Sequence, residues 1–154
     1  MGYNISDDDV KKGFENVLNL TGLMGRWHQL SDNPKIVCDT GHNSHGMKYI
    51  VDQLRKEEYN RLHIVFGMVN DKDVESVLEL MPKEAVYYFT RASIERALSP
   101  EELQAKAQKY GLNGNIYDEI SKAIESAQKN ADENDFIFIG GSSFIVADAL
   151  PLFI

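Results

Sequence analysis

The chain has 154 residues, 43% of them hydrophobic and 26% charged, with a formal net charge of −8. This length is enough for one domain with a hydrophobic core, and the acidic charge argues against nucleic acid as a partner, because nucleic-acid-binding proteins normally carry a basic face. A single cysteine excludes an internal disulfide, and no apolar run is long enough for a membrane span, so we expect a cytoplasmic protein without membrane contact.

The first segment differs from the rest of the chain. Residues 7–20 have an amphipathic pattern, to which Val17 and Leu18 contribute, and this pattern predicts a helix with Ser6 as its N-cap. A glycine-rich segment over 21–25 ends the pattern. Because this helix stands outside the alternation of strands and helices that follows, we interpret it as the remnant of an upstream domain.

From Pro34 onward, strand and helix patterns alternate. Apolar runs predict strands at 35–39, 61–67, 85–90 and 135–140, with a weaker one near 114–117. Apolar stripes at helical spacing predict helices over 47–54, 74–81, 103–110 and 120–131, and a last helix after residue 142. The strands are nearly continuous in apolar residues, as expected when both faces of a sheet are covered. The predicted fold is therefore α/β, a Rossmann-like, mostly parallel sheet with helices on both faces.

Three functional side chains follow the first predicted strand of this sheet. Asp39, His42 and Asn43 lie where that strand ends and the next helix begins. In open α/β sheets, ligands bind outside the carboxyl ends of the strands, close to helix N-termini. The segment therefore predicts a binding or catalytic site. The alternative is a polar turn in which Asn43 or Ser44 merely caps the helix.

The same segment allows other interpretations. His42, His45 and Asp39 are possible metal ligands, but a structural zinc site needs four ligands and the chain has no second Cys/His pair, so no metal is expected. The triplet 39–41, Asp-Thr-Gly, matches that of aspartic proteases, which would make the chain half of a dimeric protease with an all-β fold. A free-standing Rossmann-like module that binds a nucleotide or an amino acid is a further alternative.

Three more places in the chain carry polar groups suited to a ligand. Arg26 lies at the glycine hinge, where it could hold a phosphate or a ribose or simply face solvent. Glycines precede Ser142 after the last strand, so this turn could bind an anion or simply use Ser142 as an N-cap. Arg91 and Arg96 follow the third predicted strand and could bind a carboxylate. Asp73 is predicted to cap the second helix of the alternating region.

Taken in order, these motifs resemble the folylpolyglutamate synthase/dihydrofolate synthase family of the Mur ligase superfamily. That family has a hinge Gly-Arg, a Pro before a hydrophobic strand, Asp-Gly-Ala-His-Asn-Pro, Gly-x-x-x-Asp-Lys-Asp, an Arg-Ala-Leu-Pro-like stretch and a closing Gly-Ser. This chain has Gly25-Arg26, Pro34, Asp-Thr-Gly-His-Asn-Ser over 39–44, Gly-Met-Val-Asn-Asp-Lys-Asp over 67–73, Arg-Ala-Leu-Ser-Pro over 96–100, and Gly141-Ser142. The match begins near residue 20 and runs to the end of the chain.

The resemblance implies an ATP-dependent ligase that adds L-glutamate to folate or dihydropteroate through an acyl phosphate. It also implies that this chain is only the C-terminal domain. Residues 1–30 would be a hinge helix and linker left from a missing N-terminal ATP-binding domain, and residues 31–154 the glutamate-ligase domain. ATP and Mg²⁺ would serve the full-length enzyme, with the magnesium ligands on the missing domain and neither bound to this chain. A Mur-type cell-wall ligase, which takes another amino acid, is the alternative within the superfamily.

The resemblance further implies roles for individual residues. Arg26 and Asp39 would contact the nucleotide, Arg26 at a phosphate and Asp39 at a ribose hydroxyl, or Asp39 would instead contact the substrate ammonium group. His42 and Asp39 would be the catalytic residues. Glutamate would bind to His42, Asn43, Ser142 and Arg96.

Overall fold

A single sheet organises the part of the chain that the computed structural model describes, which comprises residues 4–16, 20–71 and 73–154. Val17, Leu18 and Lys72, which belong to two of the predicted motifs, lie outside the described residues. The six strands are β1 (His28–Asp32), β2 (Lys35–Cys38), β3 (Leu62–Phe66), β4 (Val86–Phe89), β5 (Gly114–Ile116) and β6 (Phe136–Gly140), arranged in the order β1-β2-β6-β3-β4-β5.

All pairings except one in this sheet are parallel, because only β1 runs antiparallel to its neighbour β2. The predicted mostly parallel sheet is therefore confirmed. Strands β3 and β6 are buried along their whole length, which agrees with their continuous apolar sequences.

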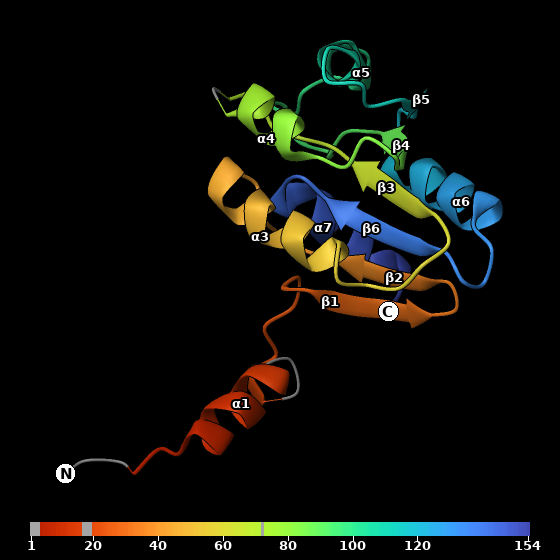
Figure 1. The fold of residues 1–154 in the computed structure, drawn as a ribbon. Coiled ribbons are helices and arrows are strands. Elements are labelled where there is room, and N and C mark those ends of the chain that lie inside the picture. Colours follow the sequence, from red (N-terminus) through yellow and green to blue (C-terminus); the bar gives the residue numbers. More distant parts are fainter. Residues whose placement is uncertain (1–3, 17–19, 72) are drawn as a thin grey trace.

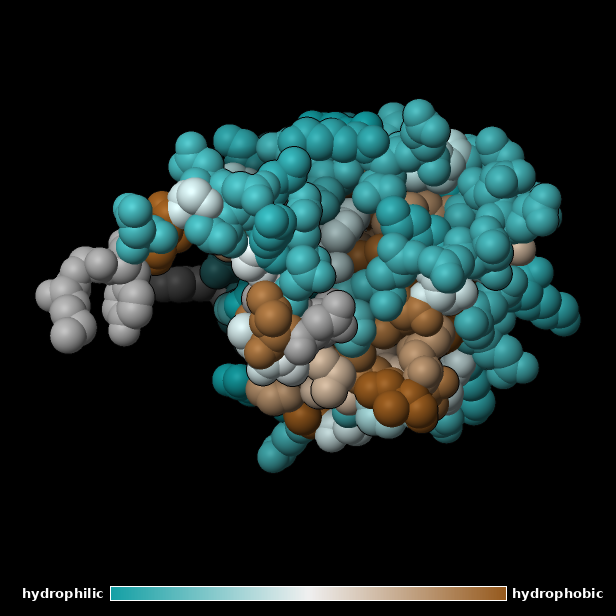
Figure 2. Space-filling view, turned by 90° about the horizontal axis from the view of Figure 1, so that it is seen from below, coloured by the Kyte–Doolittle hydropathy of each residue, from teal (hydrophilic) through white to brown (hydrophobic). Residues whose placement is uncertain are grey.

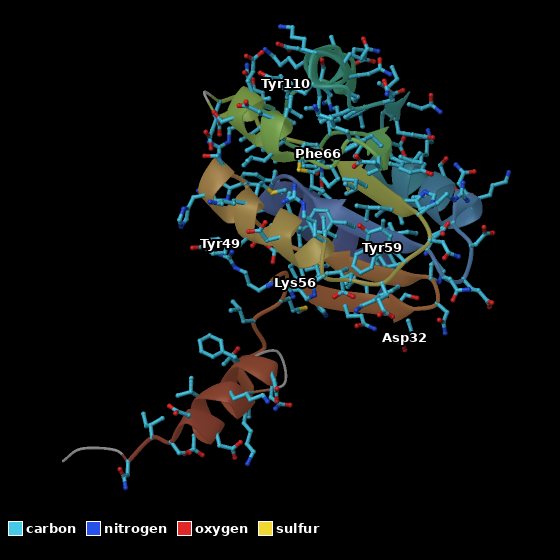
Figure 3. All side chains as sticks on the ribbon, viewed as in Figure 1. Asp32, Tyr49, Lys56, Tyr59, Phe66 and Tyr110 are labelled. Carbon is cyan, nitrogen blue, oxygen red and sulfur yellow. The ribbon has the colours of Figure 1, made fainter. Side chains whose placement is uncertain are left out.

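Helices cover both faces of the sheet, as Figure 1 shows. They are α3 (Ser44–Leu54), α4 (Val74–Leu80), α5 (Pro100–Gln108), α6 (Ile120–Asn130) and α7 (Ser143–Ala149), followed by the short 3₁₀ helix η1 (Leu150–Leu152). Alternate residues of each central strand face opposite cores. Phe66 packs in the core under α3, α4 and α5, whereas Val65 packs in the core with α6 and α7. Figure 3 shows Phe66 inside the domain and Tyr49 of α3 pointing outward.

Strand β1 is the one element of the sheet that the sequence analysis missed. The sequence predicts residues 28–30 as linker, but they belong to β1, which pairs with β2 across a turn that contains the cis Asn33–Pro34 bond. The strand reads His-Gln-Leu-Ser-Asp, which has too few apolar residues to be recognised as a strand. Its backbone pairs with that of β2, and this pairing rather than an apolar pattern defines it as the edge strand of the sheet.

Helix α1 (Asp7–Glu15) starts with a capping box between Ser6 and Asp9, so the predicted N-cap is confirmed. None of its residues is buried, and Figure 1 shows it apart from the sheet. Its apolar side chains include Val10, which is 45% exposed, and Phe14, which is 78% exposed. Figure 2, seen from the side of α1 and β1, shows apolar side chains gathered on this face. No helix among the described residues has the length and hydrophobicity that a membrane span requires.

Candidate functional site

The strand order brings the predicted site segments to one edge of the sheet. Strand β6 lies between β2 and β3, and all three are parallel, so their carboxyl ends point the same way. The segments after β2, β3 and β6 begin with Asp39, Gly67 and Gly141. The chain passes from β2 over β6 to β3, and such a crossover leaves a crevice at the carboxyl ends of the strands.

A pocket of about 280 Å³ lies at this edge. It is lined by His42, Val69, Asn70, Asp71, Arg96, Ser142, Ser143 and Phe144. These residues come from the segments after four different strands, and three of the predicted site residues, His42, Arg96 and Ser142, are among them. Arg26, Asp39 and Asn43 do not line it.

Ser142 is almost completely buried, with 1% of its surface exposed. Its Oγ accepts hydrogen bonds from the backbone N–H groups of Phe144 at 3.1 Å and Ile145 at 3.4 Å, so it caps α7. The preceding Gly141 has φ of 101°, which favours glycine, and a Cβ there would lie 2.5 Å from the carbonyl oxygen of Gly67. The turn therefore brings two strand ends into direct backbone contact, and the Ser142 hydroxyl still has a proton to donate.

Asp39 is fixed by two backbone groups. It is 9% exposed, and its carboxylate accepts from the N–H of Trp27 at 2.7 Å and from that of Gly41 at 2.8 Å. Trp27 has φ of 40°, an unusual conformation for a bulky residue, and its ring lies 6.2 Å from that of Phe136. Asp39 thus ties the hinge to the end of β2, with the exposed Arg26 next to Trp27.

His42 and Asn43 have different surroundings. The ring of His42 is exposed, and its Nδ1 lies 3.2 Å from the carbonyl oxygen of Thr40. A carbonyl can only accept, so Nδ1 is the donor in this hydrogen bond, and in the neutral ring this tautomer leaves Nε2 as an acceptor. Asn43 accepts from the N–H of Gly46 at 2.8 Å and is the N-cap of α3, as the alternative interpretation of this turn predicted.

The segment after β3 contributes residues that sequence analysis did not place in the pocket. Asn70 and Asp71 line it, and Asp71 accepts from the N–H of Asp73 at 2.8 Å. Asp73 occupies the N-cap position of α4, but its side chain does not cap that helix as predicted. Instead it accepts from the N–H of Ser44, the first residue of α3.

Other features of this edge bear on the alternatives. Among the described residues, no three or more His, Cys, Asp or Glu side chains are grouped so that they could hold a metal ion. The ring of His45 packs edge-on against Tyr49 at 5.2 Å. Burial, helped by the charge of Asp39, raises the pKa of the Cys38 thiol to about 12.

The aspartic protease alternative is wrong, because that enzyme is all-β, whereas this sheet is mostly parallel and covered by helices.

Comparisons with known proteins agree with this architecture. The model of the family "Mur ligase, glutamate ligase domain" matches residues 25–143. The dihydrofolate synthase/folylpolyglutamate synthase of Escherichia coli is 27% identical over 154 residues, which cover 98% of this chain and 34% of the relative. The chain thus spans about a third of the length of this curated relative.

Solved structures share the fold. The structure of E. coli FolC in complex with DHPP and ADP superposes with a TM-score of 0.83 and 24% identity, covering 98% of this chain and 35% of that one. A bifunctional folylpolyglutamate synthase/dihydrofolate synthase with Mn, AMPPNP and L-glutamate bound gives a TM-score of 0.78 at 24% identity, covering 96% of this chain and 34% of that one. Because the family model matches more than half of its residues, the chain belongs to the Mur ligase glutamate ligase domain family.

Proposed function

We propose that this chain is the glutamate-binding domain of an ATP-dependent ligase that joins L-glutamate to the carboxylate of folate or dihydropteroate. The observation that carries the proposal is that His42, Arg96 and Ser142 line the same pocket. The curated relative from E. coli is named for both reactions, and one structural neighbour was solved with L-glutamate bound. These names favour a folate enzyme over a Mur-type cell-wall ligase.

The pocket offers complementary groups for an amino acid. The Arg96 guanidinium and the Ser142 hydroxyl would donate to a carboxylate, and Asp71 would accept from the ammonium group. The free Nε2 of His42 would accept a proton from the ammonium group as the amine becomes a nucleophile. Held in this way, the amine would face an activated carboxylate without passing through bulk water. Asn43 would contribute by fixing the start of α3.

The nucleotide would be bound mainly outside this chain. ATP, when held by a partner domain, supplies the phosphoryl group that activates the carboxylate. Arg26 would reach a phosphate, and Asp39 would hold the adjacent Trp27 backbone in place, in addition to or instead of contacting a ribose hydroxyl. A structural neighbour was solved with Mn and AMPPNP bound, and the magnesium ligands of the full-length enzyme would lie on the partner domain.

The partner would be an N-terminal ATP-binding domain of the same polypeptide, and the segment before β1, residues 1–27, would connect to it. The exposed side chains of Val10 and Phe14 on α1 support this proposal, because an apolar stripe on a surface helix usually packs against another element. We therefore expect the chain alone neither to hydrolyse ATP nor to ligate glutamate. ATP hydrolysis or glutamate ligation by the purified chain would contradict the proposal that the reaction needs the partner domain.

Binding of L-glutamate to the isolated chain tests the proposal directly. In ¹H–¹⁵N NMR titrations, we expect L-glutamate to shift the amide signals of Asn70, Arg96 and Ser142, whereas D-glutamate should shift them much less. Perturbations confined to the opposite end of the sheet, or equal for both enantiomers, would contradict a glutamate site in this pocket.

A domain exchange tests the activity. Replacing the C-terminal third of the E. coli relative with this chain should give an enzyme that ligates glutamate. In that enzyme, His42→Ala should lower kcat/KM for glutamate by about tenfold or more. His45→Ala is a matched control, because His45 lies in the same segment but packs against Tyr49 and does not line the pocket. If both variants changed kcat/KM for glutamate equally, the proposed role of His42 in the site would be wrong.

A further inference from the structure

Arg96 lines the pocket with a fixed backbone and with a side chain that has no ion-pair partner among the described residues. Its carbonyl oxygen accepts from the N–H of Asn70 at 3.0 Å, and the neighbouring Ala97 forms an isolated antiparallel bridge with Val69. Arg61 pairs with Asp135, whereas the Arg96 guanidinium forms no ion pair or hydrogen bond with any described residue. In a chain of net charge −8, such a guanidinium is available to an anionic ligand.

The group that contacts this guanidinium is an aromatic ring. The Cζ of Arg96 lies 5.2 Å from the ring centroid of Phe144, within the range of a cation–π interaction. Phe144 is partly buried against the core formed with α6 and α7, and its N–H donates to the Oγ of Ser142. Its ring is therefore anchored by the same turn that places Ser142, and both residues line the pocket with Arg96.

We propose that Phe144 is a positioning residue that orients Arg96 for the carboxylate of the amino-acid substrate. The proposal rests on the proposed function for the identity of the ligand, but not for the contact itself. A contact between the ring face and the guanidinium restricts the long arginine side chain while leaving its N–H donors free for a carboxylate. Phe144 thus contacts Arg96 from the segment after β4 and Ser142 from the turn after β6, so one residue helps to place both hydrogen-bond donors.

The contact can be measured without a ligand. Protons near an aromatic face resonate upfield, so the Hδ protons of Arg96 should shift downfield in Phe144→Leu and keep their position in Phe144→Tyr, which retains a ring. Thermal unfolding of both variants would verify that they fold. Arg96 Hδ signals that do not respond to Phe144→Leu in a folded chain would overturn the positioning role.

Glutamate titrations of the same variants test the consequence. A partly exposed cation–π contact corresponds to about a two- to fivefold change in affinity, so Phe144→Leu should weaken L-glutamate binding by that factor and Phe144→Tyr should restore it. In the Arg96→Ala background, Phe144→Leu should have no further effect. Equal weakening in both backgrounds, or none in either, would overturn the proposal. Absence of glutamate binding by the unmodified chain, with the ring shift intact, would instead reject the proposed function.

Discussion

Asp73 at the start of α4 and Ser44 at the start of α3 are joined by a hydrogen bond of 2.6 Å between a carboxylate oxygen and a backbone N–H. The first N–H groups of a helix have no partner within the helix, so this carboxylate satisfies one of them from 29 residues away. Asp71 supports the arrangement by accepting from the N–H of Asp73. The Asp-Lys-Asp motif therefore connects two segments that line the pocket.

Removal of this connection should loosen the start of α3. We expect Asp73→Ala to lower the free energy of unfolding by about 1–2 kcal/mol, as for the loss of an N-cap, and Asp73→Asn to lower it less because an amide oxygen still accepts. Urea unfolding measures the difference. Glu133→Ala, at an exposed carboxylate with no hydrogen bond or ion pair to a described residue, is the control and should have no measurable effect. A similar loss in both alanine variants would contradict the capping role.

Gly141 should tolerate no side chain. A Cβ would lie 2.5 Å from the carbonyl oxygen of Gly67 and 2.7 Å from the ring of Phe66, and φ of 101° is unfavourable for any other residue. Gly141→Ala should therefore cost about 3 kcal/mol or more in unfolding free energy. Gly13→Ala in α1 meets nothing within 4 Å and should leave the unfolding of the domain unchanged. Differential scanning calorimetry of both variants checks the contrast.

Cys38 should react very slowly in the folded chain. Its pKa of about 12, against an ordinary value of 9.0, leaves about a thousand times less thiolate near neutral pH, and its side chain is completely buried. We expect Ellman's reagent to label it at the ordinary rate in guanidinium chloride and far more slowly without denaturant. Because the chain has one cysteine, all labelling reports on this residue. Rapid labelling of the native chain would show that the end of β2 opens readily.

Asp135 should make stability depend on acid pH. Burial alone would raise its pKa, but hydrogen bonds from the Asp132 N–H, the His63 ring and the Arg61 N–H outweigh burial and hold the pKa below the usual 3.8. A carboxyl group with a lowered pKa in the folded state stabilises it above the unfolded pKa, and this contribution is lost as pH falls through the folded pKa.

Two measurements test the role of Asp135. At pH 7, Asp135→Asn should lower the free energy of unfolding by about 2 kcal/mol, because buried donors lose a charged acceptor. Below about pH 4, the difference in unfolding free energy between the variant and the unmodified chain should become smaller. Asp132→Asn, at a side chain that is 82% exposed, is the control and should have the same unfolding free energy as the unmodified chain at both pH values. A gap that is constant with pH would contradict the lowered pKa.

Sequence patterns predicted the central sheet because its strands are buried on both faces. The fully buried β3 and β6 show this as short continuous apolar runs, which are typical of strands covered on both faces. Strand β1 could not be found in this way, because its pairing depends on the open edge of β2 rather than on its own composition.

The sequence predicted site residues correctly only where their position after a parallel strand determines that they lie at the same edge of the sheet. His42 and Ser142 follow parallel strands, so their meeting at one edge follows from the fold class. The partners of Asp39 and Asp73 were not predictable, because both carboxylates bind backbone groups brought close by tertiary packing. Phe144 has the apolar character of a core residue, and its sequence gives no sign that Arg96 lies over its ring.

The conformation of Trp27 determines where the segment between α1 and β1 can bend. Its backbone is bound by Asp39 and its ring packs on Phe136, so this end moves as one piece with the sheet. Gly25 is held in the same unit, because it is buried and its carbonyl oxygen accepts from the N–H of Thr40 at 2.8 Å. Gly22, with φ of 67°, is exposed and precedes this unit. Any motion of α1 relative to the sheet should therefore have its hinge at Gly22, while Trp27 stays fixed to the sheet. A lower ¹H–¹⁵N heteronuclear NOE at Leu23 than at Trp27 would show that the chain bends before Trp27.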